Sequence, residues 1–340
     1  MYFDPHKPIL YLENMNNNRR KKQLILSSVL VFVFVVLNIG CQWEAEQFPY
    51  ASSSNKFSAF MVPDTNLDVY VYAQQKSLTS IPAGLINMPN NVDVESLAMW
   101  GVPEDEKLVL GMCLTLANTT IAAEVYPKII LDGQIWKLLR DNRIYLVRGS
   151  GSSAESMKTT IVNNNFKYYT DRKVLETIAT MPNRGSVTLA AIAVVKPSKA
   201  VINTISEIKG ISYIDQIIKL TKLLNPDVVV CGLYSPHQIN IARAIDVMET
   251  KGISALDVGT LVLVKSGLPS FVQNSVAKSV LAGQGFVGKS SNGFLLYEGS
   301  VTTPDRKSVP VLIRIEDSYI FAAAAGQTAY AETLITGIYK

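Results

Sequence analysis

Short runs rich in Val, Ile, Leu and Tyr, bounded by turn residues, recur between residues 69 and 325 and constrain the fold more than any other feature. Runs of this length and composition predict β-strands. We expect strands at Val69–Tyr72, Leu108–Leu116, Ile121–Val125, Ile144–Val147, Val187–Val195, Asp227–Leu233, Gly259–Val264, Phe294–Tyr297, Val309–Ile315 and Tyr319–Ala325. Asn118, Thr119 and Thr120 lie between two of these runs and predict a hairpin turn.

Helices are predicted between several of the strands, because capping residues precede stretches with an apolar period of about 3.6 residues. We expect helices from about Ala154, over Lys199–Ile208 with Ser198 as the cap, over Ile211–Leu224, from Ser235 to Gly252, over Pro269–Gly283, and from Thr328 onward. Strands and helices therefore alternate along the chain, and some strands form hairpins.

One internal match indicates a repeat. Residues Gly149–Ile161 align without gaps to Gly326–Ile338, and each copy follows a short apolar strand and opens a helix. Hairpins mixed with strand–helix–strand units favour ferredoxin-like layering over a doubly wound parallel sheet. We therefore expect an α+β fold after an N-terminal signal or anchor helix, with two related ferredoxin-like modules over residues 57–185 and 186–340.

The N-terminal segment carries targeting signals. Arg19, Arg20, Lys21 and Lys22 precede an uncharged run over Leu24–Gly40. A basic region followed by an apolar region is typical of a secretory signal, and the run also reaches the lower limit for a membrane-spanning helix. We expect residues 1–40 to be a signal peptide or an anchor; Met15 would start a signal of ordinary length.

The segment ends Asn38-Ile39-Gly40-Cys41, which resembles the lipobox of prokaryotic lipoproteins. The resemblance implies that Cys41 is linked to diacylglycerol and becomes the new N-terminus, that the membrane is a partner, and that the body lies outside the cytoplasm. The alternative that stays open is an uncleaved anchor helix. Residues 41–56 contain a proline and a serine triplet and read as a flexible tether.

Charge excludes one class of partner. Residues 1–40 hold five of the 32 Lys and Arg residues but two of the 28 Asp and Glu residues, so the remaining chain is close to neutral. Nucleic-acid binding requires a basic surface. We therefore expect no nucleic-acid partner. The ligand expected for the folded body is an unknown protein or small molecule.

Residues 283–290 read GQGFVGKS and match the Walker A pattern of nucleotide-binding loops. A working P-loop lies between a strand and the helix that follows it. Here the predicted order is reversed, since a helix precedes the loop and a turn at Asn292-Gly293 and a strand follow. We interpret the stretch as a helix-to-strand connection in which Gly283 ends the helix and Lys289 is solvated.

A second loop has the right context for anion binding. Arg148, Ser150, Gly151 and Ser152 follow a predicted strand and precede a predicted helix, whose N-terminal N–H groups attract anions. The competing interpretation is structural: Ser152 and Glu155 would form an S-x-x-E capping box. Both interpretations stay open, although the capping box is the simpler one.

The other reactive residues support no catalytic constellation. His237 is the only histidine after the N-terminal segment. The sequence predicts that it lies in the first turn of a helix that Ser235 caps. Cys113 and Cys231 lie in apolar runs, either as buried thiols or as a disulfide pair. Glu104, Asp105 and Glu106 read as a solvated turn. We expect no metal site and no cofactor.

The leading hypothesis is a membrane-anchored extracytoplasmic lipoprotein whose body binds a partner or serves a structural role in the envelope without catalysis. The first alternative is an extracytoplasmic enzyme of unknown reaction that uses the Arg148–Ser153 loop and His237. The second is a nucleotide-binding protein that uses GQGFVGKS.

Overall fold

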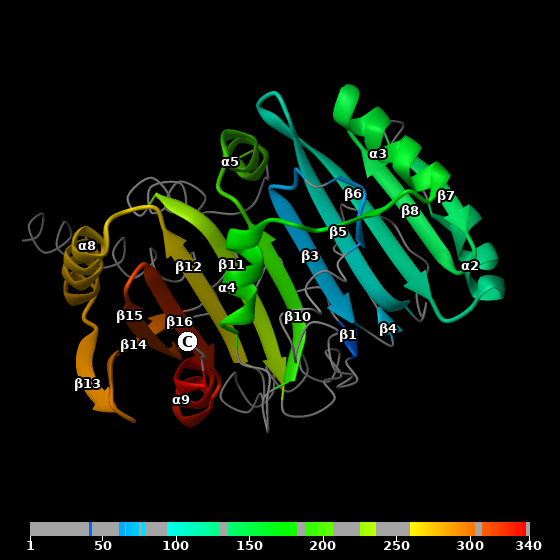
Figure 1. Cartoon of the computed structure of the whole chain (residues 1–340). Helices are drawn as coiled ribbons and strands as arrows, with labels where there is room; N and C mark the ends of the chain where they lie inside the picture. The colour runs from blue at the N-terminus through cyan, green and yellow to red at the C-terminus, as the bar shows by residue number, and fades with distance from the viewer. Residues whose placement is uncertain are drawn as a thin grey trace, which may run out of the picture.

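A single twelve-stranded sheet forms the body of the protein, as the computed structural model shows (Figure 1). The structure describes residues 41–42, 61–64, 66–74, 77–78, 94–129, 135–181, 188–206, 225–235, 259–302 and 308–337. From edge to edge the sheet contains β13 (Val287–Ser291), β14 (Phe294–Thr302), β15 (Ser308–Glu316), β16 (Tyr319–Ala325), β12 (Gly259–Ser266), β11 (Pro226–Ser235), β10 (Thr188–Val195), β3 (Val69–Gln74), β5 (Val94–Glu104), β6 (Lys107–Leu116), β8 (Arg143–Arg148) and β7 (Ile135–Arg140). Every neighbouring pair in this sheet is antiparallel.

The remaining elements are short strand pairs and helices. β1 (Cys41–Gln42) pairs with β4 (Ser77–Leu78), and β2 (Met61–Val62) pairs with β9 (Lys167–Tyr168). The helices are α2 (Thr119–Val125), α3 (Ser152–Asn163), α4 (Arg172–Ala179), α5 (Lys199–Ser206), α8 (Ser270–Gly283) and α9 (Thr328–Thr336), with a 3₁₀ turn at Tyr126–Lys128.

The expected pair of ferredoxin-like modules is wrong. Two separate modules would each form a sheet of their own, whereas the described strands form one twelve-stranded sheet in which β10 pairs with β3 and joins the two halves. The predicted boundary between residues 185 and 186 lies outside the described residues. The fold is therefore dominated by one continuous sheet with helices on both faces.

Two-residue hairpin turns explain much of the antiparallel order. Asp105, Asp141, Asn292 and Asp317 each open such a turn, and each adopts a positive φ between 49° and 54°. Asp and Asn tolerate this left-handed conformation better than other residues with a side chain. The predicted turn at Asn292-Gly293 is confirmed, since both of its residues have positive φ.

The two faces of the sheet carry separate cores. Along a strand successive side chains point to opposite faces, so Tyr145 and Leu261 belong to one core and their neighbours Ile144 and Val262 to the other. We call the first the front face. Helices α3, α4 and α9 cover the front face, as Figure 1 shows, whereas α2 and α8 contribute buried residues to the back face.

The sheet also repeats an order of elements. In the first half, β5-β6-β8-β7 are neighbours, α2 follows β6 and α3 follows β8. In the second half, β11-β12-β16-β15 are neighbours, α8 follows β12 and α9 follows β16. The sequence match between Gly149–Ile161 and Gly326–Ile338 falls on the start of α3 and the start of α9, which are equivalent places in this order.

A pair of glycines strengthens the equivalence. A Cβ atom on Gly111 of β6 would clash with the thioether of Met157 in α3, and one on Gly259 of β12 would clash with Leu334 in α9. Met157 and Leu334 are aligned positions of the sequence match. In each half, a glycine on the equivalent strand, β6 or β12, therefore lets the last helix of that half approach the sheet closely.

Some of the local predictions agree with the structure and one does not. Ser198 caps α5, since its hydroxyl accepts from the N–H of Val201 at 3.2 Å, and α8 and α9 begin within one residue of the expected positions. The strand predicted at Ile121–Val125 is wrong: Asn118 accepts from the N–H of Ile121 at 2.9 Å and starts helix α2 instead of a hairpin. The helix predicted over Ile211–Leu224 lies outside the described residues. Of the helix predicted from Ser235 to Gly252, Ser235 is the last residue of β11, and the rest, with His237, lies outside the described residues.

Candidate functional site

The Arg148–Ser153 loop has the strand-loop-helix order that the sequence predicts. β8 ends at Arg148, Gly149 and Gly151 adopt φ values of 133° and 95°, and α3 begins at Ser152. Arg148 and Ser150 are exposed, and Gly151 is the N-cap residue of α3. The loop therefore presents the free N–H groups of a twelve-residue helix, which favour a negative charge.

A carboxylate of the same chain occupies this helix start. Glu104, at the end of β5, accepts from the N–H of Ser152 at 2.7 Å and from the N–H of Ser153 at 3.0 Å. The Ser152 hydroxyl also donates to Glu104, at 3.1 Å. Gly151 permits this approach, because a Cβ atom there would lie 2.9 Å from Glu104 Cδ. The loop thus binds an anion, and the anion is a side chain from 48 residues earlier.

The predicted capping box does not form. Ser152 is the first residue of α3 rather than its cap, and Glu155 pairs with Lys158 at 2.7 Å instead of reaching back. Glu104 takes the role that Ser152 and Glu155 were expected to share. Glu104 was expected to lie in a solvated turn. The hairpin turn that Asp105 opens is the local signal that fixes the position of Glu104 at the end of β5.

The hydrogen bonds at α3 make the stability of the protein depend on pH. Hydrogen bonds from the Ser153 hydroxyl and from the backbone N–H groups of Ser153 and Ser152 lower the pKa of Glu104. A carboxyl group whose pKa is lower in the folded state stabilises that state above its unfolded pKa of about 4.5, and the contribution disappears as pH falls through the folded pKa.

We therefore expect Glu104→Gln to lower the urea midpoint of unfolding at pH 7 and to have a smaller effect at pH 3. The neighbouring Glu106→Gln, whose carboxylate is outside this contact, is the matched control. A Glu104→Gln effect that is the same at both pH values would show that the charge of Glu104 does not stabilise α3.

The GQGFVGKS stretch is a helix-to-strand connection, as predicted. α8 ends at Gly283, and β13 begins at Val287 and runs into a hairpin rather than a helix. The left-handed glycine is Gly285, with φ of 82°, instead of Gly283. The Lys289 ammonium lies 3.3 Å from Glu298 on β14, so it has a carboxylate partner on the next strand.

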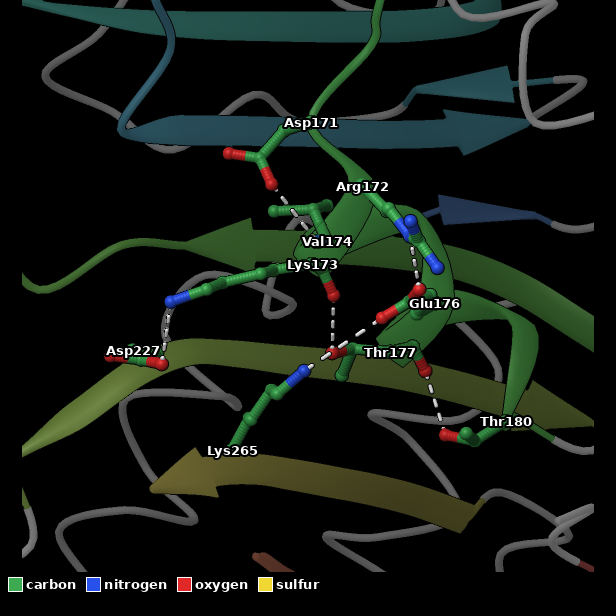
Figure 2. A network of polar contacts seen from close by, with 9 residues as sticks. All are labelled: Asp171, Arg172, Lys173, Val174, Glu176, Thr177, Thr180, Asp227 and Lys265. Carbon is green, nitrogen blue, oxygen red and sulfur yellow. Dashed lines mark hydrogen bonds and ion pairs between the residues drawn. The ribbon is translucent and has the colours of Figure 1, made fainter. Parts of the chain in front are cut away.

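A second polar cluster links α4 to the second half of the sheet through ion pairs (Figure 2). Asp171 accepts from the N–H of Val174 at 3.2 Å and pairs with Lys196, directly after β10. Two further ion pairs extend the cluster: Lys173 with Asp227 of β11 at 3.0 Å, and Glu176 with Lys265 of β12 at 4.0 Å. Burial opposes ionisation of Asp171, but its bonds to Lys196 and to the helix N–H groups leave its pKa below the ordinary value. Because these charges pair with one another, the cluster reads as a structural clamp on α4.

The two cysteines after the N-terminal segment are buried free thiols. Cys113 belongs to the front core and Cys231 to the back core, so the sheet itself separates them and the disulfide alternative is wrong. Burial raises the pKa of Cys113 to about 11 and that of Cys231 to about 12. Neither thiol is therefore suited to act as a nucleophile at neutral pH.

Across the described ranges, no group of three or more His, Cys, Asp or Glu side chains could hold a metal ion. In the described part of the chain, no helix combines the length and apolar character needed to cross a membrane. Cys41 lies in β1, opposite Leu78 of β4.

Comparisons with known proteins identify no family. No protein-family profile matches the chain, and no curated protein matches it. Among solved structures, it is weakly similar to an N-terminal dehydratase from a difficidin assembly line, with 9% identity over 81% of this chain and 83% of that chain and a TM-score of 0.11. A score this low carries no argument about fold or activity.

Proposed function

We propose that the chain is an extracytoplasmic lipoprotein anchored in the membrane through Cys41, and that its sheet is a binding or envelope-structural module without catalysis. The observation that carries the proposal is the order of basic residues, apolar run and Gly40-Cys41 at the N-terminus. The contacts of the described body support the second part. Glu104 and Lys289, which lie at the two loops with candidate chemistry, are engaged in contacts within the chain, and the thiols of Cys113 and Cys231 are buried.

We expect Cys41→Ser to abolish lipid attachment. Mass spectrometry of the native N-terminal peptide should find diacylglycerol on Cys41 as the first residue, whereas the Cys41→Ser protein should keep its apolar segment and carry no lipid. Membrane fractionation cannot replace this measurement, because an uncleaved segment over Leu24–Gly40 would also hold the protein in the membrane.

Gln42→Ala is the matched control, since it changes the next residue and keeps the thiol. Its N-terminal peptide should carry the same lipid as the unmodified chain. An intact N-terminus that starts at Met1 or Met15 in the unmodified chain would disprove the lipoprotein proposal and leave the anchor helix.

A further inference from the structure

The β13–β14 hairpin extends the sheet beyond the repeated order of elements. In the first half, β7 is the last strand of the described sheet; in the second half, the equivalent strand β15 carries β14 and then β13 beyond it. The hairpin is thus an addition to the unit that both halves share. β14 contributes the fully buried Leu296 to the front core, whereas β13 contributes no buried residue and only extends the sheet.

β13 is an exposed edge strand with little protection. Four of its five residues are exposed, and it pairs with β14 without a bulge. Natural edge strands are usually protected by charges, prolines or bulges. The only charge on β13 is Lys289, and Glu298 lies 3.3 Å from it.

Apolar side chains lie on both sides of this edge. Val287 is 69% exposed and Leu295 is 53% exposed; of the four large exposed hydrophobic residues in the described chain, these two belong to the hairpin. Gly288 leaves Leu295 uncovered, because a Cβ atom on Gly288 would be in van der Waals contact with the Leu295 side chain at 3.6 Å. The missing side chain of Gly288 therefore leaves a notch in the edge strand, and the side chain of Leu295 lies at its base.

The turn fixes which backbone groups are free at this edge. A two-residue turn makes Ser291 and Phe294 a hydrogen-bonded pair, and such pairs alternate along an antiparallel ladder. Lys289 and Val287 consequently direct their N–H and C=O groups toward β14. Gly288 and Ser290 direct theirs outward, where a further strand can pair with them.

We propose that β13 pairs antiparallel with β13 of a second copy of this chain, around a two-fold axis at Gly288, so that the sheet continues across the dimer. Such an isologous pairing closes after two copies. The two Leu295 side chains then lie on the same face of the joined sheet, each next to Gly288 of its own copy. Val287 of one copy lies opposite Lys289 of the other, which covers its exposed side chain with the lysine stem.

Charge selects this register over its neighbours. A dimer centred on Lys289 would place two ammonium groups directly opposite each other, and like charges at opposite positions destabilise a sheet. A dimer centred on Ser290 would place Gly288 opposite Asn292, which belongs to the turn and has a φ of 51°. The register centred on Gly288 keeps the two lysines apart. It pairs Gly288 with its counterpart and lets the N–H of Ser290 donate to the carbonyl oxygen of Phe286 in the other copy; the N–H of Phe286 donates to Leu281 within its own chain.

Cross-linking of the full chain in detergent tests the register. Gly288→Cys should form a disulfide dimer under copper–phenanthroline oxidation, because hydrogen-bonded partners lie about 5.5 Å apart at Cα, within the range of a disulfide. Lys289→Cys should cross-link far less, since its two copies would be about 8 Å apart and disulfides require less than about 7 Å. The unmodified chain is the control for Cys41, and Cys113 and Cys231 are buried.

Sedimentation equilibrium tests the association itself. Ser290→Pro removes an N–H group that faces outward and leaves the pairing with β14 intact, so it should abolish the dimer without unfolding the protein. Ser290→Thr keeps that group and should remain dimeric. A monomeric unmodified chain, a dimer that survives Ser290→Pro, or stronger cross-linking at Lys289→Cys than at Gly288→Cys would each overturn the proposal.

Discussion

Gly259→Val is expected to lower the free energy of unfolding by about 3 kcal/mol, the upper end of the cost of overpacking a core. A Cβ atom at this position of β12 would clash with Leu334 and lie 2.8 Å from Cε1 of the Tyr330 ring. The ring is rigid, so relief requires α9 to move away from the sheet. Urea unfolding followed by far-UV circular dichroism gives the difference directly, provided that the slope of the transition is unchanged.

The equivalent glycine of the first half gives an internal comparison. Gly111→Val would clash with the thioether of Met157, which can change rotamer, and would meet Trp100 Cε3 at 3.0 Å. We therefore expect a smaller loss than at Gly259. Gly283→Ala serves as the control, because no atom lies within 4 Å of a Cβ there. If Gly259→Val costs no more than Gly283→Ala, α9 does not depend on close approach to β12.

The strands were predictable where their side chains are uniformly apolar. Nine of the ten predicted runs are strands of the sheet, but β5, β7 and β13 were missed. β7 carries Lys137 and Arg140, and β5 contains Trp100 and Pro103, so neither reads as a simple apolar run. The tenth run became helix α2, because the Asn118 cap outweighed the β-branched residues that follow it.

Which strands pair with each other was harder to predict than where the strands lie in the sequence. The contact between β10 and β3, which merges two halves into one sheet, joins residues more than a hundred positions apart and has no local signal. The long separation in sequence also explains why only part of the candidate site was predicted. The Arg148–Ser153 loop was predictable from its glycines and its helix start, whereas its partner Glu104 lies 48 residues earlier. Asp105, Asp141 and Asp317 also open hairpin turns, but of these four two-residue turns only Asn292-Gly293 was predicted.

Arg314→Ala is expected to destabilise the protein by about 3 kcal/mol, the lower end of the cost of removing one partner from a buried ion pair. Arg314 lies on β15 with 3% of its side chain exposed and forms an ion pair with Glu316. Its guanidinium carbon is 3.7 Å from the centroid of the Phe294 ring, and Nη1 donates to the carbonyl oxygen of Ile335 at 3.3 Å. Truncation therefore removes a stacked cation, a hydrogen bond to α9 and the ion pair with Glu316.

Arg140 in the first half is the matched control. It lies on β7, the strand equivalent to β15, and donates to the carbonyl oxygen of Ile161 at 2.9 Å in α3, the helix equivalent to α9. Because Arg140 is only half-buried and lies at the sheet edge, water can replace its hydrogen bonds, and Arg140→Ala should cost about 1 kcal/mol. Thermal unfolding of both variants measures the contrast. Equal losses at the two positions would mean that contact with the helix end, rather than burial among Phe294 and Glu316, sets the contribution of Arg314.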